Sequence, residues 1–472
     1  MEVSRSIARG IAGRLTCDDL QAQSKSAEDL VGLITCAETS EARFARQEEF
    51  GSVTELRSAL VHILAKGSDY GQYWGCIAIS YLLHCNPGNV RLFGEETEGI
   101  FEAISTCLES PQSQGVACGL LSQLAFGNVE NSVRICDERG ILERIALVMR
   151  HGRSMDKHAA SCAISNCAAN GSALALKIVA VPLLLKGLTD LCVEHRSADG
   201  GFDSRGGVSA IGCMDNLSFH KEVRPILLEM SVLTVIRPIM EGRNERVWGE
   251  GSRVMSAEAA MIVARLTPAE ELPNLKVDHV VLCTIVHCLR CAIDGEFWAS
   301  FAWRLWELLE PIALLTSNVD NCQALTAEGA CKQLVRVLQL PDWDGELAPA
   351  GYVPRSGRAH CVQALANMAA LPACFAALNG VRILIPPSQP GGYPAWENAP
   401  GVLERWGRQD EGLVDPRMWL LRERHLAVAM GLHRRLGGGS GLCALDGDIL
   451  NIILNYASSA GVAAGELASW LR

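Results

Sequence analysis

The sequence predicts an all-α fold in which helical repeats stack into a solenoid, and three observations carry this prediction. The stretch 157–188 is apolar on most of its faces, so a helix formed by it must lie between neighbours. Similar stretches recur along the chain with a period of roughly 40–50 residues, within reach of the range for helical repeat families. Aromatic residues make up only 6% of the chain, which favours closely packed helices over sandwiches or barrels.

The stretch 157–188 reads KHAASCAISNCAANGSALALKIVAVPLLLKGL. A short polar break at 169–172 separates two expected helices, and the second of these ends in the aliphatic run 183–188. Because a single helical unit cannot bury so large an apolar surface by itself, we expect neighbouring units to stack and share one continuous core.

The other units follow the same plan of an alanine-rich helix, a polar turn and a helix that ends in an aliphatic run. Lead-in helices are expected at 27–37, 42–50 and 53–65. Five full units then span 74–108, 115–149, 157–188, 207–240 and 257–289, and two weaker ones follow at 305–340 and 359–385.

This pattern divides the chain into four parts. Residues 1–66 are predicted to be N-terminal lead-in or capping helices, and residues 67–385 the repeat solenoid, with a glycine-rich insert at 194–207. Residues 386–401 read as a proline/glycine linker. The remaining residues, 402–472, are expected to form a small helical C-terminal appendage.

Charge and cysteine content narrow the class of protein. The formal net charge is −11, which argues against a protein that mainly binds nucleic acid, since that work needs a clustered basic surface. The 19 cysteines are scattered without a disulfide pattern, so we expect a reducing compartment. No stretch is long and apolar enough for a membrane span.

The segment 1–15 faintly resembles a mitochondrial presequence, but Glu2 and the pair Asp18–Asp19 weaken that interpretation. The expected location is the cytoplasm, with the nucleus as an alternative.

Sequence motifs of enzymes are missing from the chain. There is no phosphate-binding loop, no G-x-G-x-x-G after a strand, no H-E-x-x-H and no nucleophile elbow. We therefore expect a protein that is not an enzyme and that carries no cofactor and no metal.

Several segments resemble armadillo repeats, which typically read A-L-x-N-L-A at the start of one helix and G-G-I-x-x-L-x-x-L at the start of another. Arg139–Gly140–Ile141–Leu142 and Asn379–Gly380–Val381 match the glycine start. The asparagine place is taken by Gln123, Asn166, Asn216 and Asn367. The resemblance covers roughly residues 70–385, and it implies a right-handed armadillo-type solenoid of about seven units.

The resemblance also implies a function for this series of four residues, which we call the ladder. In armadillo proteins that grip extended peptides, the ladder asparagine lies in the concave groove and hydrogen-bonds the backbone of the peptide. Gln123, Asn166, Asn216 and Asn367 are therefore the candidate partner-binding residues. The alternative is that such an asparagine only donates a hydrogen bond to the carbonyl of a neighbouring loop. Receptors for nuclear signals place a tryptophan one turn before each asparagine. This chain has Cys162, Gly212 and Gln363 there, so the aromatic positions that hold lysine side chains in those receptors are missing.

Two clusters admit both a functional and a packing interpretation. Cys283, His287, Cys288 and Cys291 have a metal-like spacing on one expected helix, but residues i and i+8 lie about 12 Å apart along its axis, too far to share one zinc ion. We predict that these cysteines fill a buried face. The aromatic residues of 297–306 are expected on one short helix, where they pack between units or form a docking patch.

The C-terminal region suggests two further alternatives. The basic stretch 417–435 is expected to be a solvated helix face, or else a surface for acidic partners. The tail 445–470 faintly resembles an F-box, although Asp446 stands where the expected proline would be. The predicted function is thus a protein-interaction scaffold or adaptor that binds extended partner segments. The alternatives are a ubiquitin-ligase substrate adaptor and an architectural subunit of a cytoskeletal or ciliary assembly.

Overall fold

The computed structural model describes residues 2–37, 39–194, 205–241, 250–298, 301–340, 354–369, 371, 383–384 and 413–414. Most of the expected insert 194–207 lies outside these residues, as do the linker 386–401, the basic stretch 417–435 and the F-box-like tail. The chain divides into two compact units. Unit 1 comprises residues 1–315 and 342–357, and unit 2 comprises residues 316–341 and 358–472.

Unit 1 is built from triplets of helices. Each triplet starts with a long helix, and these are α2 (Leu20–Thr35), α5 (Asp69–Leu83), α8 (Gln114–Ala125), α11 (Ser154–Ala169) and α14 (Arg205–Phe219). A shorter helix follows: α3 (Ser40–Gly51), α6 (Pro87–Gly94), α9 (Val129–Asp137), α12 (Ser172–Val179) or α15 (Arg224–Glu229). The third helix is α4 (Thr54–Lys66), α7 (Ile100–Cys107), α10 (Ile141–His151), α13 (Pro182–Glu194) or α16 (Val232–Met240).

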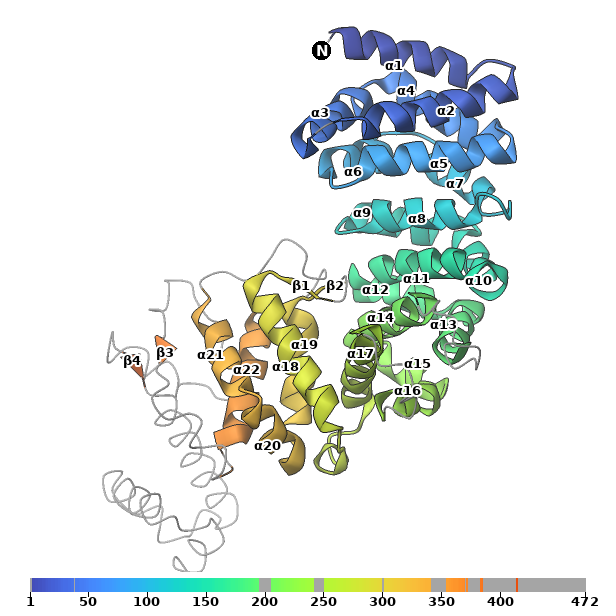
Figure 1. Ribbon diagram of the computed structural model, residues 1–472. Helices are drawn as coiled ribbons and strands as arrows, with labels where there is room; N and C mark the ends of the chain where they lie inside the picture. Colours follow the sequence, from blue (N-terminus) through green and yellow to red (C-terminus); the bar gives the residue numbers. More distant parts are fainter. Residues whose placement is uncertain are drawn as a thin grey trace, which may run out of the picture. The chain divides into compact units, whose positions relative to one another are not determined.

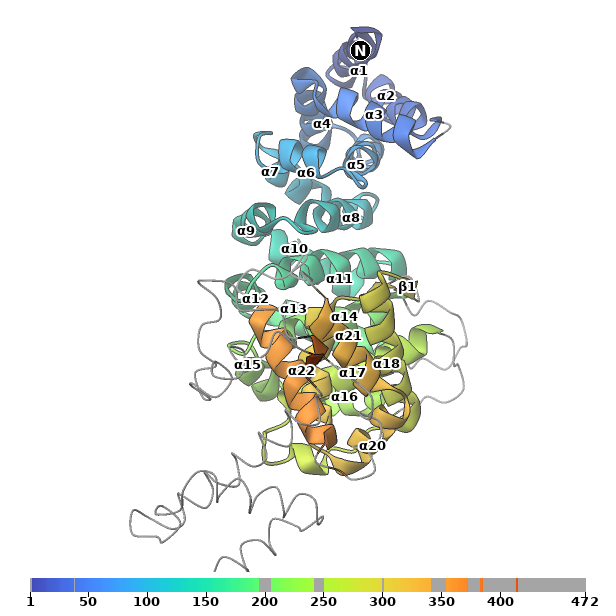
Figure 2. The same ribbon diagram turned by 90° about the vertical axis from the view of Figure 1, so that its left-hand side faces the viewer.

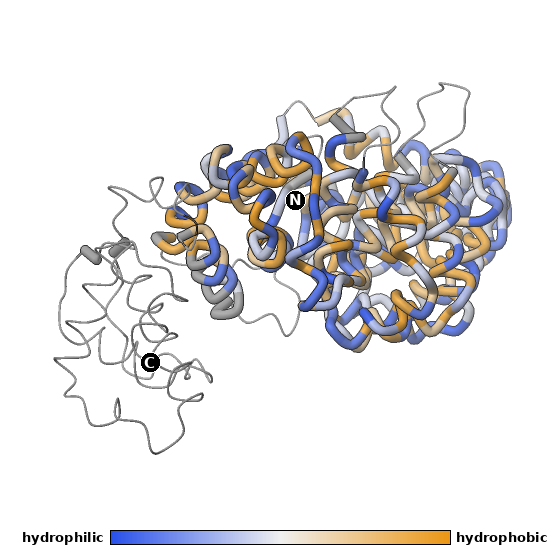
Figure 3. Tube along the Cα trace, turned by 90° about the horizontal axis from the view of Figure 1, so that it is seen from below, coloured by the Kyte–Doolittle hydropathy of each residue, from blue (hydrophilic) through white to orange (hydrophobic). Residues whose placement is uncertain are grey.

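The long helices stack on one another in chain order. Contacts join α2 to α5, α5 to α8, α8 to α11, α11 to α14, and α14 to α17 (Glu250–Leu266), as Figure 1 shows. We call α2, α5, α8, α11, α14 and α17 the long-helix row. Figure 2 shows α4 and α7 on the other side of the stack from α5 and α8. Hydrophobic and hydrophilic segments alternate along the helices (Figure 3), because each helix buries one face against its neighbours.

The apolar stretch that begins at Lys157 lies between neighbouring helices, as predicted from its sequence. Its first helix, α11, packs between α8 and α14, and Ala160, Ala163 and Cys167 are fully buried there. The break at 169–172 is also observed. The expectation of only two helices is wrong, however, because Pro182 starts a third helix, α13. Proline lacks a backbone N–H and is therefore well suited to the first turn of a new helix.

Two local devices start helices in several of the triplets. Asn86 and Asn128 cap α6 and α9 by accepting a hydrogen bond from the backbone N–H three residues later. Gly140 precedes α10 with φ +84°, a left-handed conformation that glycine adopts without strain. This confirms the expected glycine start at 139–142, whereas the corresponding stretch 379–381 lies outside the described residues. Ser231 takes the glycine place before α16 with φ +56°.

The end of unit 1 departs from the triplet plan. After α17 come a 3-10 turn, η1 (Leu272–Asn274), then α18 (His279–Asp294) and α19 (Leu305–Leu315). The expected single aromatic helix is wrong, because Phe297–Trp298 (β1) and Phe301–Ala302 (β2) pair as two antiparallel strands. Trp306 lies in α19, where its ring contacts Phe219 at 5.0 Å between centroids.

Unit 2 contains α20 (Val319–Ala327), α21 (Ala330–Gln339) and most of α22 (Pro354–Ala369). Two short antiparallel strands, β3 (Ile383–Leu384) and β4 (Leu413–Val414), also belong to it.

The N-terminal segment forms a further helix, α1 (Glu2–Leu15), which packs on α2, α3 and α4. Its buried face includes Ala8, Ile11 and Leu15, so this helix is part of the first layer of the stack. Among the described residues, none of the helices combines the length and the apolar character needed to cross a membrane.

Candidate functional site

The ladder residues of unit 1 lie on three consecutive members of the long-helix row. Gln123 is on α8, Asn166 on α11 and Asn216 on α14, and all three side chains are half-buried. Since α8, α11 and α14 contact one another in that order, the structure places these residues on successive layers, as the repeat pattern predicts.

One hydrogen-bond pattern links each ladder asparagine to the helix before it. Asn166 Nδ2 donates to the backbone oxygen of Ser122 at 2.9 Å and to its Oγ at 3.0 Å. Asn216 Nδ2 donates to the backbone oxygen of Ser165 at 3.3 Å and to its Oγ at 2.9 Å. Each serine directly precedes the ladder residue of its own helix, so the pattern repeats in register. We call this pair of hydrogen bonds the staple.

The staple uses the donor end of each amide. A side-chain amide also carries a carbonyl oxygen with two acceptor sites, and Oδ1 of Asn166 and Asn216 accepts no hydrogen bond from the described part of the chain. Gln123 Oε1 is buried and has no hydrogen-bond partner in that part either. Each of these two asparagines therefore ties the preceding long helix through Nδ2, and no hydrogen bond within the described residues uses its oxygen.

The fourth ladder residue belongs to unit 2. Asn367 lies on α22, half-buried, and its Nδ2 donates to Thr316 Oγ1 at 3.0 Å. Here too the amide nitrogen bonds a hydroxyl of an earlier part of the chain.

Sequence reasoning missed the ladder residue of α17. Arg265 Nη1 lies 2.5 Å from Asp215 Oδ1, and Asp215 directly precedes Asn216 just as Ser165 precedes Asn166. In this layer, an ion pair between Arg265 and Asp215 therefore stands where the staple stands in the two earlier layers. Its side chain is 0% exposed, it donates to the backbone oxygen of Glu307 at 2.6 Å, and it lies 3.4 Å from Glu310. Arg224 Nη2 completes the group with bonds of 2.8 and 2.9 Å to Glu310.

Two further carboxyl groups lie near this ionic group. Burial, with Asp215 and Glu307 nearby, raises the pKa of Glu258 well above its usual range. Glu258 Oε2 has no hydrogen-bond partner in the described residues. Burial also raises the pKa of Glu307 to about 7. These two side chains therefore hold protons at a pH where exposed glutamates are charged.

Exposed apolar side chains accompany the ladder. Tyr81 stands five residues before the cap Asn86, as Gln123 stands five before the cap Asn128, and it is 39% exposed. Phe126 lies one turn after Gln123 and is 58% exposed. Both rings are thus exposed at, or one turn after, the ladder place of their helices.

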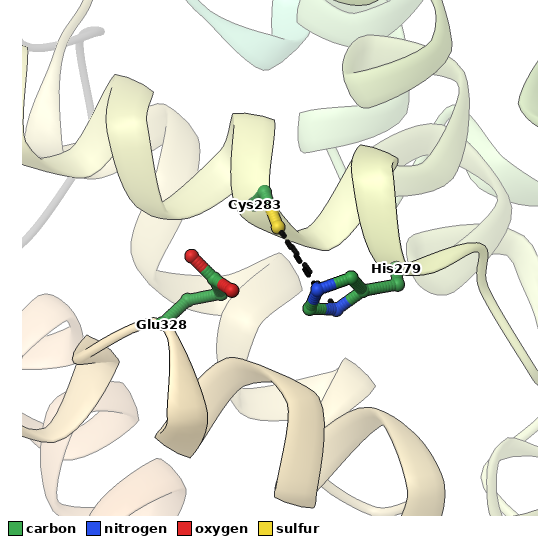
Figure 4. A group of neighbouring side chains, drawn as sticks. All are labelled: His279, Cys283 and Glu328. Carbon is green, nitrogen blue, oxygen red and sulfur yellow. Dashed lines mark hydrogen bonds between the residues drawn. The ribbon is translucent and has the colours of Figure 1, made fainter.

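The cysteine-rich helix α18 packs largely as predicted. Cys288 and Cys291 are buried, and the ring of His287 contacts Trp298 at 4.8 Å between centroids. Figure 4 shows His279 and Cys283 on consecutive turns of α18, with Nε2 and Sγ 3.6 Å apart. Glu328, drawn in the same figure, belongs to unit 2. A structural zinc site takes four ligands, so this pair of side chains in unit 1 does not make one by itself.

Comparisons with known proteins address the fold. An engineered protein of solved structure matches with a TM-score of 0.52 and 17% sequence identity over 78% of this chain and 81% of its own. A designed armadillo repeat protein matches with a TM-score of 0.45 and 17% identity, over 55% of this chain and 99% of its own. Another, solved in complex with the peptide (KR)4, matches with a TM-score of 0.44 and 17% identity over the same shares.

No family model and no curated protein matches the sequence. At such identities the likeness concerns the fold alone. The repeating helix triplets, together with the likeness to the engineered protein, show an all-α solenoid, which confirms the predicted fold class.

Proposed function

We propose that the chain is a non-enzymatic scaffold or adaptor that binds an extended segment of a partner protein along the long-helix row. The observation that carries this proposal is the staple. It holds the amides of Asn166 and Asn216 in one orientation on consecutive layers, with Oδ1 uncommitted on each. Backbone N–H groups of an extended chain are donors that need such acceptors, and they recur at regular intervals whatever the sequence of the chain.

The apolar side chains beside the ladder support the same function. Tyr81 and Phe126 are exposed although they are large and hydrophobic, and aromatic residues are frequent at the centres of protein interfaces. The free thiols among the described residues are compatible with a reducing compartment, and we propose the cytoplasm as the location, with the nucleus as the alternative.

The test distinguishes the role of the asparagine oxygen in binding from the role of the staple in holding the helices. Asn216→Ala removes both, whereas Asn216→Asp keeps an acceptor oxygen and loses the Nδ2 donor. Ser165→Ala keeps the asparagine and removes the hydroxyl end of the staple. The proposal predicts that partner capture falls about tenfold for Asn216→Ala, as expected for one lost hydrogen bond of about 1.4 kcal/mol. It predicts a smaller loss for Ser165→Ala, which keeps Oδ1 and the bond from Nδ2 to the backbone oxygen of residue 165.

The opposite ranking counts against the proposal. If Ser165→Ala weakens capture as much as Asn216→Ala, the staple matters only because it keeps the helices in place. The same comparison at Asn166 and Ser122 gives an independent replicate one layer earlier.

A further inference from the structure

Three side chains with the elements of an activated thiol meet beside the ladder. His158 and Cys162 lie one turn apart on α11, and Ser209 comes from α14, which packs against it. His158 Nδ1 is 2.6 Å from Ser209 Oγ. Cys162 Sγ lies 3.6 Å from the same oxygen and 3.9 Å from both ring nitrogens of His158.

The group lies on the ladder side of its helices. Cys162 stands four residues before Asn166, and Ser209 stands seven before Asn216, so each is one or two turns from its ladder residue on the same helix face. Cys162 and His158 are half-buried, whereas Ser209 is only 8% exposed. The thiol is therefore screened from bulk water and still reachable by a small molecule.

The neighbours of the sulfur favour its charged form. Burial by itself opposes a thiolate, but the hydrogen bond and charge of His158 and the hydroxyl of Ser209 outweigh it, and the pKa of Cys162 lies below its usual range. The thiolate is the reactive form of cysteine. Buried cysteines nearby behave in the opposite way, since burial raises the pKa of Cys213 and hydrogen bonding with Cys136, together with burial, raises that of Cys167.

We propose that Cys162 is a nucleophilic thiol that reacts selectively with hydroperoxides, placing an oxidised sulfur on α11 one turn before the ladder residue Asn166. The thiolate sulfur attacks one peroxide oxygen, an S–O bond forms and the O–O bond breaks. The sulfur loses two electrons, and the other peroxide oxygen departs as hydroxide from hydrogen peroxide, or as alkoxide from an organic hydroperoxide. This anion takes a proton from the imidazolium of His158 and leaves as water or as the alcohol. The product is a sulfenic acid, and the proposal does not depend on what the ladder binds.

The experiment measures modification of each cysteine in the full-length, reduced chain by mass spectrometry. The chain is exposed to limiting hydrogen peroxide in the presence of dimedone, which traps sulfenic acid, and separately to iodoacetamide over a range of pH. Cys85, which is exposed, is the internal reference, and the fully buried Cys118 reports loss of the fold.

The proposal predicts that Cys162 carries most of the dimedone adduct although Cys85 is more exposed. Its alkylation should reach half of the maximal rate at a lower pH than that of Cys85. His158→Gln should slow alkylation of Cys162 at neutral pH by about tenfold, because the positive charge that stabilises the thiolate is lost, and Ser209→Ala should slow it less.

Equal rates at Cys162 and Cys85 in the unaltered chain would overturn the proposal. An unchanged rate in a folded His158→Gln variant, with Cys118 unlabelled, would do the same. If that variant labels at Cys118, it has unfolded, and the pH profile of the unaltered chain then decides: a profile shared with Cys85 rejects the proposal and a shifted one supports it.

Discussion

Asn216 on α14 donates a hydrogen bond of 2.9 Å to the hydroxyl of Ser165 on α11. The same bond, 3.0 Å long, joins Asn166 to Ser122 one layer earlier. A polar contact that repeats between consecutive long helices fixes their relative rotation, and it thereby fixes where the two amide oxygens point. In this chain the stability of the stack and the geometry of the candidate binding site depend on the same atoms.

The first prediction is a coupling between Asn216 and Ser165. Because each residue loses its partner when the other is replaced, Asn216→Ala and Ser165→Ala should be less than additive in a double-mutant cycle. We expect a coupling of about 0.5–1.5 kcal/mol in the free energy of unfolding, measured by urea titration. Asn216→Ala combined with Ser122→Ala, which belongs to another staple, serves as the control and should be additive.

The second prediction concerns the buried arginine of α17. Arg265→Met should lower the free energy of unfolding by about 3–5 kcal/mol, because Asp215 and Glu310 lose a buried positive partner. The urea midpoint measures this change. Arg9→Met is the matched control, since Arg9 pairs with Glu55 on the surface, where both side chains are more than half exposed. It should cost less than about 1 kcal/mol, and equal losses in the two variants would refute the assignment.

The third prediction is a pH dependence due to Glu258. Its pKa is raised in the folded chain, so the folded chain keeps the proton after the unfolded chain has released it. Stability therefore falls as the pH rises above the ordinary glutamate pKa. Glu258→Gln removes this loss, and we expect it to gain about 1 kcal/mol or more over the unaltered chain between pH 5 and pH 8, since one pKa unit corresponds to about 1.4 kcal/mol. Thermal melting at both pH values measures the difference.

The control for this prediction is Glu130→Gln, the same change at an exposed position on α9. A Glu258→Gln variant whose advantage over the unaltered chain shrinks between pH 5 and pH 8 would contradict the assigned role of Glu258.

The fourth prediction compares two helix starts. Ser231 adopts the left-handed conformation that Gly140 adopts at the equivalent place. Since a side chain in this region costs roughly 1 kcal/mol, Ser231→Gly should raise the melting temperature and Gly140→Ser should lower it. If Ser231→Gly is destabilising, an interaction of the serine side chain outweighs the backbone strain.

The sequence was sufficient to predict the stack of helices because the apolar period and the glycine before α10 are local signals. The three-helix form of each unit was harder to predict. The short helices α12 and α15 have few residues, so their apolar period is hard to recognise. The sequence marks their limits only indirectly: Asn128 caps the equivalent helix α9, and Pro182 starts the helix that follows α12. The strand pair at Phe297 was missed because its few aromatic residues have a spacing that fits one helical turn as well as a tight hairpin.

The candidate site could be predicted only in part. The asparagine places were found from the repeat, but the staple partners were not, although Ser122, Ser165 and Asp215 each directly precede a ladder residue. Arg265 was missed because an arginine at an asparagine place breaks the motif. Its role becomes visible only through its contact with Asp215, which lies 50 residues away in the chain.

The measurement that tests the central claim most directly is affinity capture from native cell extract with the unaltered chain and with a variant in which all four ladder residues, Gln123, Asn166, Asn216 and Asn367, are alanine. Mass spectrometry identifies the captured proteins, and circular dichroism checks that the variant is folded. The account predicts that a small set of partners is lost from the folded variant. An unchanged set of partners would contradict it and would place binding elsewhere on the chain.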